Sequence, residues 1–222
     1  MNASRWRLAL RLLLRDWRAG EQRILVAALV IAIAATTAIS FFTERLANGM
    51  QNSSAEFLGA DLALVSSRQV DAGWLDAARE QGLRLAETLE FASVVLHGEQ
   101  LQLSSIKAVD GQFPLRGSMR TATTVYAGDE PTAGVPAPGE AWAGPRLLQA
   151  LGLAVGDLVE VGESRLRVSR VLTFEPGQMR DVFGVAPRLL INMADVPATG
   201  VIQPGSRLSW QYLFAGPADA IG

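Results

Sequence analysis

The longest apolar run in the chain covers residues 24–42 and has no charged side chain in nineteen positions. As an α-helix that rises about 1.5 Å per residue, this run spans roughly 28 Å, close to the bilayer's hydrocarbon thickness of about 30 Å. Buried helices of soluble proteins are rarely apolar on every face. The pattern therefore predicts a transmembrane helix over residues 24–42.

Small side chains recur at every fourth position of this run. They are Ala28, Ala32, Thr36 and Ser40. Residues at this spacing share one helix face, and a face of small residues lets transmembrane helices approach closely. Alanine is common in such helices, so chance is the alternative explanation. We expect this face to pack against other transmembrane helices.

The residues before the span have a different, amphipathic pattern. An apolar stripe recurs at helical spacing and consists of Trp6, Leu10, Leu13 and Trp17. A basic stripe beside it consists of Arg7, Arg11, Arg15 and Arg18. Indole rings on one side and arginines on the other are typical of a helix that lies in the membrane interface against anionic lipid. We expect residues 1–23 to form this helix, with Trp6, Arg7, Arg11, Arg15, Trp17 and Arg18 as its anchors; a soluble, core-facing helix is the alternative.

Charge predicts the orientation of the span. Arginines dominate the segment before it, whereas Glu44 and Arg45 balance each other directly after it. Because basic flanks remain in the cytoplasm, the N-terminus should be cytoplasmic and the residues after about 43 should lie outside it. A cleaved signal peptide is the competing interpretation. Its apolar region is usually shorter and ends in an Ala-x-Ala-like site, whereas this run ends in Phe41-Phe42.

Helical spacing continues through residues 43–58, which predicts a helical stalk between the membrane and a domain. The period then changes, and the following elements alternate in type. We expect a strand at 61–65, a helix at 71–81, a hairpin of strands 85–96 and 101–109, a strand at 120–126, a loop at 127–140, a helix at 145–151, a hairpin of strands 158–161 and 165–174, and strands at 187–192 and 209–214. This order predicts an α+β fold.

Composition removes several classes of chemistry. The chain has no cysteine and one histidine, His97, so it cannot form a disulfide, a thiolate site or a histidine-rich metal cluster. It contains neither a Gly-x-Ser-x-Gly elbow nor a Gly-x-x-x-x-Gly-Lys-Ser/Thr loop, so it cannot hydrolyse ATP unaided. We expect no catalytic residue, cofactor or metal site.

Two charged groups suggest binding but have simpler explanations. Asp157, Glu160 and Glu163 surround a predicted β-turn and should form a solvated edge. Strand alternation places Arg165 and Arg167 on one face and Arg170 on the other. Because the residues after the span are acidic overall, nucleic acid is not an expected partner.

Several segments resemble those of a known family. A basic amphipathic helix, a first transmembrane helix and a stalk lead into Phe57-Leu58-Gly59-Ala60-Asp61-Leu62. Later come Ala186-Pro187-Arg188-Leu189-Leu190-Ile191-Asn192, Asp195-Val196, Thr199-Gly200 and Gln203-Pro204-Gly205-Ser206-Arg207. Together they resemble the FtsX-like or MacB-like permease subunits of ABC transporters, in particular the YbbP-type branch.

This resemblance implies a fold and a domain order. It implies a MacB-like periplasmic domain in which residues 59–119, completed by 208–222, form a porter-like α+β subdomain. Residues 120–207 would form a small, mostly-β subdomain inserted into it.

The resemblance also implies a function. Such a chain would be the N-terminal part of a non-catalytic permease in the bacterial inner membrane. A separate ATP-binding cassette ATPase would hydrolyse ATP, and mechanotransmission would move or extract a hydrophobic compound, lipoprotein or peptide in the periplasm. The expected partners are this ATPase, other transmembrane helices of the permease and membrane lipid.

One departure from the family keeps alternatives open. The further transmembrane helices and the cytoplasmic docking loop of these permeases do not occur before Gly222. The alternative is a single-span, membrane-anchored periplasmic binding or adaptor domain without transport activity. An anchored hydrolase is disfavoured because no nucleophile-base pair is evident.

Overall fold

The computed structural model describes residues 21–177 and 186–217. Its contacts divide the chain into two compact units, Met1–Asn52 and Ser53–Gly222, and each is described by itself. The expected interfacial helix lies almost entirely outside the described residues, and its six anchors lie wholly outside them.

The first unit contains most of α2 (Glu21–Leu58), an unbroken α-helix of 38 residues. Within it, Ile24–Arg45 is long and apolar enough to cross a membrane, and none of that stretch is buried. The Thr36 hydroxyl donates to the carbonyl oxygens of Ala32 and Ile33, both at 3.0 Å. A hydroxyl satisfied within its own helix can face lipid at little cost. The predicted N-terminal apolar helix is therefore confirmed, and the helix continues through the expected stalk.

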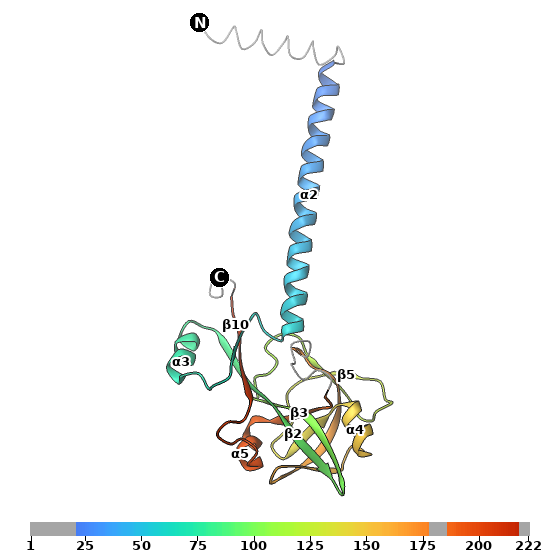
Figure 1. Cartoon of the computed structure of the whole chain (residues 1–222). Helices are drawn as coiled ribbons and strands as arrows, with labels where there is room; N and C mark the ends of the chain where they lie inside the picture. Colours follow the sequence, from blue (N-terminus) through green and yellow to red (C-terminus); the bar gives the residue numbers. More distant parts are fainter. Residues whose placement is uncertain (1–20, 178–185, 218–222) are drawn as a thin grey trace. The chain divides into compact units, whose positions relative to one another are not determined.

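The second unit consists mainly of strands, with short helices between them (Figure 1). In chain order its elements are β1 (Leu62–Ser66), α3 (Ala72–Glu80), β2 (Arg84–His97), β3 (Gln100–Val109), β4 (Met119–Ala122), β5 (Glu130–Thr132), β6 (Glu140–Ala143), α4 (Pro145–Leu151), β7 (Leu158–Val161), β8 (Ser164–Phe174), β9 (Arg188–Asn192), the 3₁₀-helix η2 (Met193–Asp195), α5 (Val196–Thr199) and β10 (Leu208–Ala215). The predicted α+β class is confirmed.

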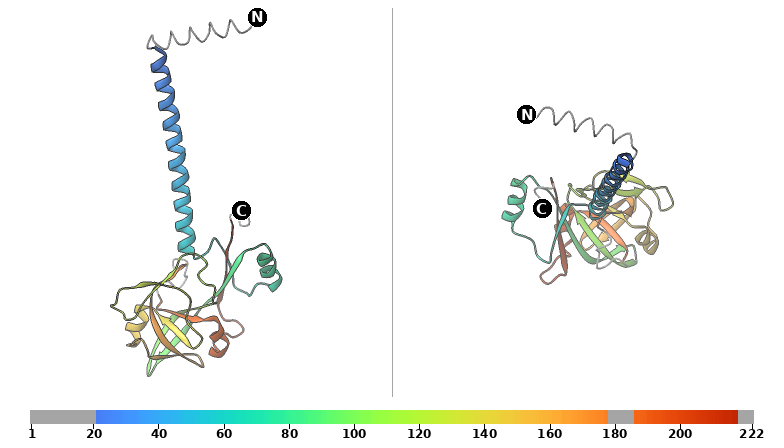
Figure 2. Two further views of the ribbon diagram at one scale, coloured as in Figure 1. Left: turned by 180° about the vertical axis from the view of Figure 1, so that it is seen from behind. Right: turned by 90° about the horizontal axis from the view of Figure 1, so that it is seen from above.

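Six of these strands pair in a closed ring. The order is β2, β3, β9, β6, β8 and β7, and β7 returns to pair with β2. The β3–β9 and β6–β8 pairs are parallel, whereas the other four are antiparallel. Figure 2 shows the same strands from behind and from above. A closed ring leaves no free strand edge of its own.

Alternating side chains fill the interior of the ring. The buried apolar residues that its strands contribute to this core are Leu89, Phe91, Val95, Ile106, Ala108, Ala141, Ala143, Val159, Val161, Leu166, Val168, Val171, Leu189 and Ile191. The buried leucines of α4 extend this core. Alternation is interrupted in β8, where the register against β6 shifts between Val168 and Arg170.

That shift corrects one prediction. Simple alternation would place Arg170 on the face opposite Arg165 and Arg167. All three arginines are exposed, while Leu166, Val168 and Val171 are buried. A β-bulge inserts one extra residue, so Arg170 faces outward like the other two arginines.

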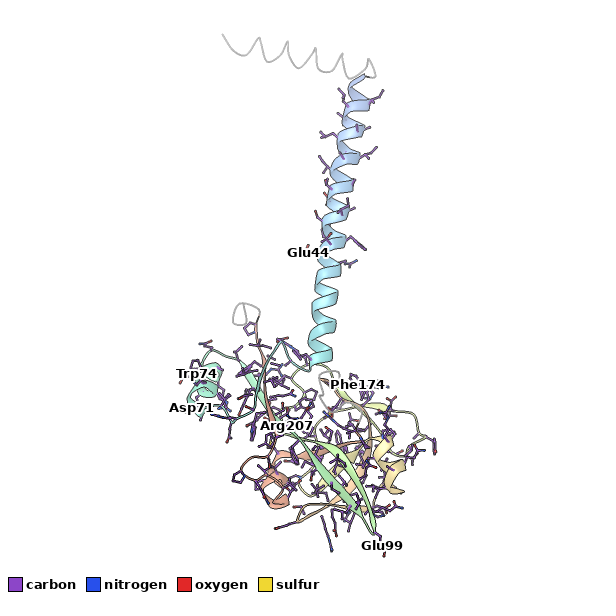
Figure 3. The ribbon with its side chains drawn as sticks, viewed as in Figure 1. Glu44, Asp71, Trp74, Glu99, Phe174 and Arg207 are labelled. Carbon is purple, nitrogen blue, oxygen red and sulfur yellow. The ribbon has the colours of Figure 1, made fainter. Side chains whose placement is uncertain are left out.

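A smaller sheet extends from the ring along the first half of β2. Residues 84–91 of β2 pair with β10, and β10 pairs in turn with the edge strand β1. One face carries Tyr212 and Phe214, which pack with Leu75 of α3. Trp74, on the same helix, is exposed (Figure 3).

The ladders cross the boundary expected at residue 120. β3, from the expected porter-like part, pairs with β9, from the expected inserted part. β6 begins at the last residue of the loop expected at 127–140. It is one of the six strands of the ring and pairs with β9 and β8. Its four residues are too few to display a clear period. The assignment of residues 59–119 and 120–207 to two subdomains stays a prediction.

Candidate functional site at the junction after α2

The chain turns sharply where α2 ends. Gly59 follows Leu58 and adopts a φ of +76°, in the left-handed region that favours glycine after a helix. A Cβ atom at Gly59 would lie 2.9 Å from Cβ of Pro176. Because conformation and space both exclude a side chain, the glycine permits close packing at the base of the helix.

The next residues are tied to two other segments. Arg116 Nε donates to Asp61 Oδ1 at 3.0 Å, and its Nη2 donates to Oδ2 at 2.8 Å. The Gly216 N–H also donates to Asp61 Oδ2, while the Asp61 N–H donates to the Phe214 carbonyl oxygen. The Arg116 N–H donates to the Gly59 carbonyl oxygen at 2.9 Å. Asp61 therefore joins the start of the domain to the loop after β3 and to the end of β10.

The Arg116 hydrogen bonds dominate the electrostatics of this contact. They lower the pKa of Asp61 below its usual value, although partial burial acts in the opposite direction. The same contact raises the pKa of Arg116. A two-point guanidinium–carboxylate contact is directional, so it fixes orientation as well as distance. We call Gly59–Asp61 with Arg116 and Gly216 the junction clamp.

Next to the clamp lies a group of four buried charges on the outer face of the ring. They are Glu90 on β2, Lys107 on β3, Glu175 after β8 and Arg188 on β9, and we call them the charge quartet. Their side chains are at most 6% exposed. Strand pairing places Glu90 directly opposite Lys107, and Ser105 directly opposite Arg188.

Each carboxylate in the quartet contacts both cations. Lys107 Nζ lies 3.3 Å from Glu90 Oε1 and 3.4 Å from Glu175 Oε1. Arg188 Nη2 lies 3.0 Å from Glu90 Oε1 and also donates to Glu175 Oε1. The ring of Phe113 covers Lys107, with Nζ 4.7 Å from its centroid. Two positive and two negative charges thus compensate one another away from water.

Burial alone would raise the pKa of Glu175, because desolvation penalises the charged form. The nearby charges of Lys107 and Arg188 outweigh this effect and hold the pKa of Glu175 below its usual value. Glu175 therefore remains ionised at neutral pH. Its position is bound to those of β3 and β9.

The quartet and the clamp share one short segment, Glu175-Pro176-Gly177. Glu175 is a member of the quartet, while Pro176 packs against Gly59 of the clamp. A displacement of Gly59 would press on Pro176 and so on a fixed buried charge. Gly59 and Glu175 are thus linked through Pro176. In the described part of the chain, no group of three His, Asp or Glu side chains could hold a metal ion.

The sequence-predicted site residues lie elsewhere. Ala28, Ala32, Thr36 and Ser40 lie in α2 and are exposed in this chain, so their role in helix packing stays a prediction. Sequence reasoning singled out neither the clamp nor the quartet. The available signals were isolated charges in apolar strands, such as Lys107 in Ser-Ile-Lys-Ala-Val and Arg188 before Leu-Leu-Ile.

Comparison with known proteins adds one substantial sequence similarity. The chain is 37% identical over 202 residues to the uncharacterized ABC transporter permease YbbP of Escherichia coli strain K12, covering 91% of this chain. No family model matches the chain.

Two solved structures are similar to this chain at a TM-score of 0.45 each. The periplasmic region of MacB from Actinobacillus actinomycetemcomitans is 9% identical, with coverage of 75% of this chain and 81% of that one. A domain assigned to a permease protein of Porphyromonas gingivalis is 14% identical, with coverage of 70% and 74%.

The sequence similarity confirms the predicted resemblance to ABC transporter permeases, in particular to the YbbP type. One N-terminal apolar helix and a sheet-rich domain fit an inner-membrane protein with a periplasmic domain. The chain spans about a quarter of the length of this relative.

Proposed function

We propose that this chain is part of the membrane permease subunit of an ABC transporter of the FtsX/MacB type. In this proposal a separate ATPase subunit hydrolyses ATP, and α2 passes the resulting motion to the periplasmic domain. The N-terminus is cytoplasmic, and the residues after about 43 are periplasmic. The cargo is a hydrophobic compound, a lipoprotein or a peptide.

The observation that carries this proposal is the continuity of α2 into the junction clamp. A hydrogen-bonded helix of 38 residues transmits displacement better than a flexible linker of the same length. Directly after it, Gly59 is packed against Pro176 and Asp61 is held by Arg116. In this proposal, motion of the helix reaches the domain through these contacts.

Further features support the membrane side of the proposal. The face formed by Ala28, Ala32, Thr36 and Ser40 would pack against other transmembrane helices of the permease. The arginines and tryptophans before the span would anchor the cytoplasmic end in lipid.

The test expresses the permease gene product together with a candidate ATP-binding cassette ATPase from the same organism. We expect the two to co-purify. Because this stretch has no cysteine, labels can be placed at Glu44→Cys and Glu99→Cys, the latter at the exposed tip of the β2–β3 hairpin (Figure 3). Electron spin resonance should show that ATP with vanadate changes the distance between the two labels.

The junction clamp gives the experiment its internal control. Arg116→Gln should reduce the ATP-dependent change without preventing co-purification. Arg165→Gln removes an exposed ion pair with Glu160 and should leave the change intact. An ATP-insensitive distance, or equal effects of the two variants, would contradict the proposed coupling. If no ATPase co-purified, the anchored adaptor would become the better explanation.

A further inference from the structure

A polar cavity of about 370 Å³ lies on the second unit beside β4, β5 and β8. Its lining includes the hydroxyl side chains of Thr121, Thr123 and Thr132 and two charged residues, Glu130 and Arg170. The volume falls within the range of small-molecule sites. Neither the junction clamp nor the charge quartet contributes to this lining.

The floor of the cavity is fixed by hydrogen bonds. Thr121 is only 2% exposed, and its Oγ1 lies 2.6 Å from Thr132 Oγ1. Arg170 Nη1 donates to the same Thr121 oxygen at 3.4 Å. The bulge in β8 is what turns Arg170 outward to this position. The β-bulge thus brings the Arg170 guanidinium within hydrogen-bonding distance of the buried Thr121 hydroxyl.

The wall of the cavity is held by an ion pair outside it. Arg120 Nε and Nη2 donate to the two carboxylate oxygens of Asp129, both at 2.9 Å, and Thr173 donates to Asp129 Oδ2. The Arg120 hydrogen bonds lower the pKa of Asp129 to about 2. The carboxylate therefore stays ionised at neutral pH and holds the loop next to Glu130.

The charges of the two charged residues in the cavity are not compensated by ion pairs in the described part of the chain, because none of those pairs includes Arg170 or Glu130. A guanidinium presents paired donors that match the two oxygens of a carboxylate. A carboxylate such as Glu130 accepts hydrogen bonds from an ammonium or hydroxyl group.

We propose that this cavity binds a small zwitterion, whose carboxylate pairs with Arg170 and whose ammonium group pairs with Glu130. The threonine hydroxyls supply further hydrogen bonds to the polar groups between them. One guanidinium and one carboxylate give a cavity of zero net charge, which matches a zwitterion and leaves a doubly charged phosphate uncompensated. Free amino acids and short peptides both carry this chemistry.

The experiment titrates the full 222-residue chain, in nanodiscs of uncharged phospholipid, with four probes. Glycine and alanyl-alanine carry both charges and differ in the separation of their ends, so they distinguish an amino acid from a peptide. N-acetyl-alanyl-alanine keeps the carboxylate alone, and alanyl-alaninamide keeps the ammonium alone. Amide shifts of residues 121–133 report binding. We expect saturable shifts with a zwitterion and at least about tenfold weaker binding when either charge is removed.

Variants locate the site. Arg170→Gln should weaken zwitterion binding by about tenfold or more, and Arg170→Lys should weaken it less because the charge remains. Arg167→Gln, an exposed arginine on the same strand that does not line the cavity, is the matched control and should change binding less than about twofold. Glu130→Gln should weaken alanyl-alanine but not its N-acetyl form. The proposal is overturned if neither zwitterion gives saturable shifts, if the amide binds as well as alanyl-alanine, or if the two glutamine substitutions on β8 have the same effect.

Discussion

Each carboxylate of the charge quartet contacts both cations. If one carboxylate is removed, two buried positive charges face a single buried negative charge. Glu175 contacts Lys107 and Arg188 and is itself only 1% exposed. Removing one partner of a buried ion pair is costly because the other charge stays buried. An exposed ion pair lacks this penalty, because water replaces the lost partner.

We therefore predict that Glu175→Gln lowers the free energy of unfolding by about 3–5 kcal/mol. Glu160→Gln makes the same chemical change at the exposed pair with Arg165 and should cost at most about 1 kcal/mol. Denaturant unfolding of the full chain in detergent, followed by tryptophan fluorescence, measures both. Equal losses would show that the quartet contributes no more than a surface pair.

The same residue predicts the direction of the pH dependence. The pKa of Glu175 is lower in the folded chain than in the unfolded one. Its contribution to stability is therefore complete above the unfolded pKa, near pH 4, and is lost as the pH falls towards the folded value. Glu175→Gln should flatten the loss of stability below pH 4 in the same measurement.

At the scale of elements, the end of α2 depends on a glycine that serves two purposes. Gly59 and Gly82 have nearly the same φ, +76° and +79°, and each follows a helix. A Cβ at Gly82 meets nothing within 4 Å, whereas one at Gly59 meets Pro176 at 2.9 Å. Comparing substitutions at the two glycines therefore separates the energetic cost of the backbone conformation from the cost of a steric clash with Pro176.

We predict that Gly82→Ala lowers the free energy of unfolding by about 1 kcal/mol, the backbone cost alone. Gly59→Ala should cost a further 1–3 kcal/mol or so, because Pro176 must shift while Glu175 stays in the quartet. Denaturant unfolding of the two variants gives the difference. If they were equally stable, Pro176 would yield freely, and tight packing at the junction would be refuted.

Elements with strong local signals were predictable from the sequence. The hairpins of β2 with β3 and of β7 with β8 have alternating apolar residues and short turns, and both form with nearly the expected bounds. β6 and α5 have four residues each and show no usable period. Arg170 was misplaced for a related reason, since a bulge depends on the neighbouring strand and not on the strand's own sequence.

At the scale of the whole second unit, closure of the ring distinguishes its strands from the edge strand β1. Opening the ring requires the loss of an entire ladder, such as that between β3 and β9. β1 pairs on one side only, with β10. Its Leu62, Leu64 and Val65 are also exposed.

We predict that hydrogen exchange separates these two classes. Amides of β3 and β9 should exchange slowest, at rates set by unfolding of the unit, whereas those of β1 should exchange through local opening at least about tenfold faster. Hydrogen exchange of the full chain in detergent, read by mass spectrometry, tests this. Equal protection of β1 and β3 would mean that the edge strand unfolds only with the ring.

The sequence by itself determined what depends on neighbours along the chain: the apolar helix, the local hairpins, the lack of cysteine and of a Gly-x-x-x-x-Gly-Lys-Ser/Thr loop, and the family resemblance. The tertiary structure decided which strands close the ring, which charges are buried and where a cavity forms. Arg188 and Glu90 are 98 residues apart, and Asp61 and Gly216 are 155 apart. Such contacts are chosen by strand register and burial, and these are fixed only when the whole domain packs.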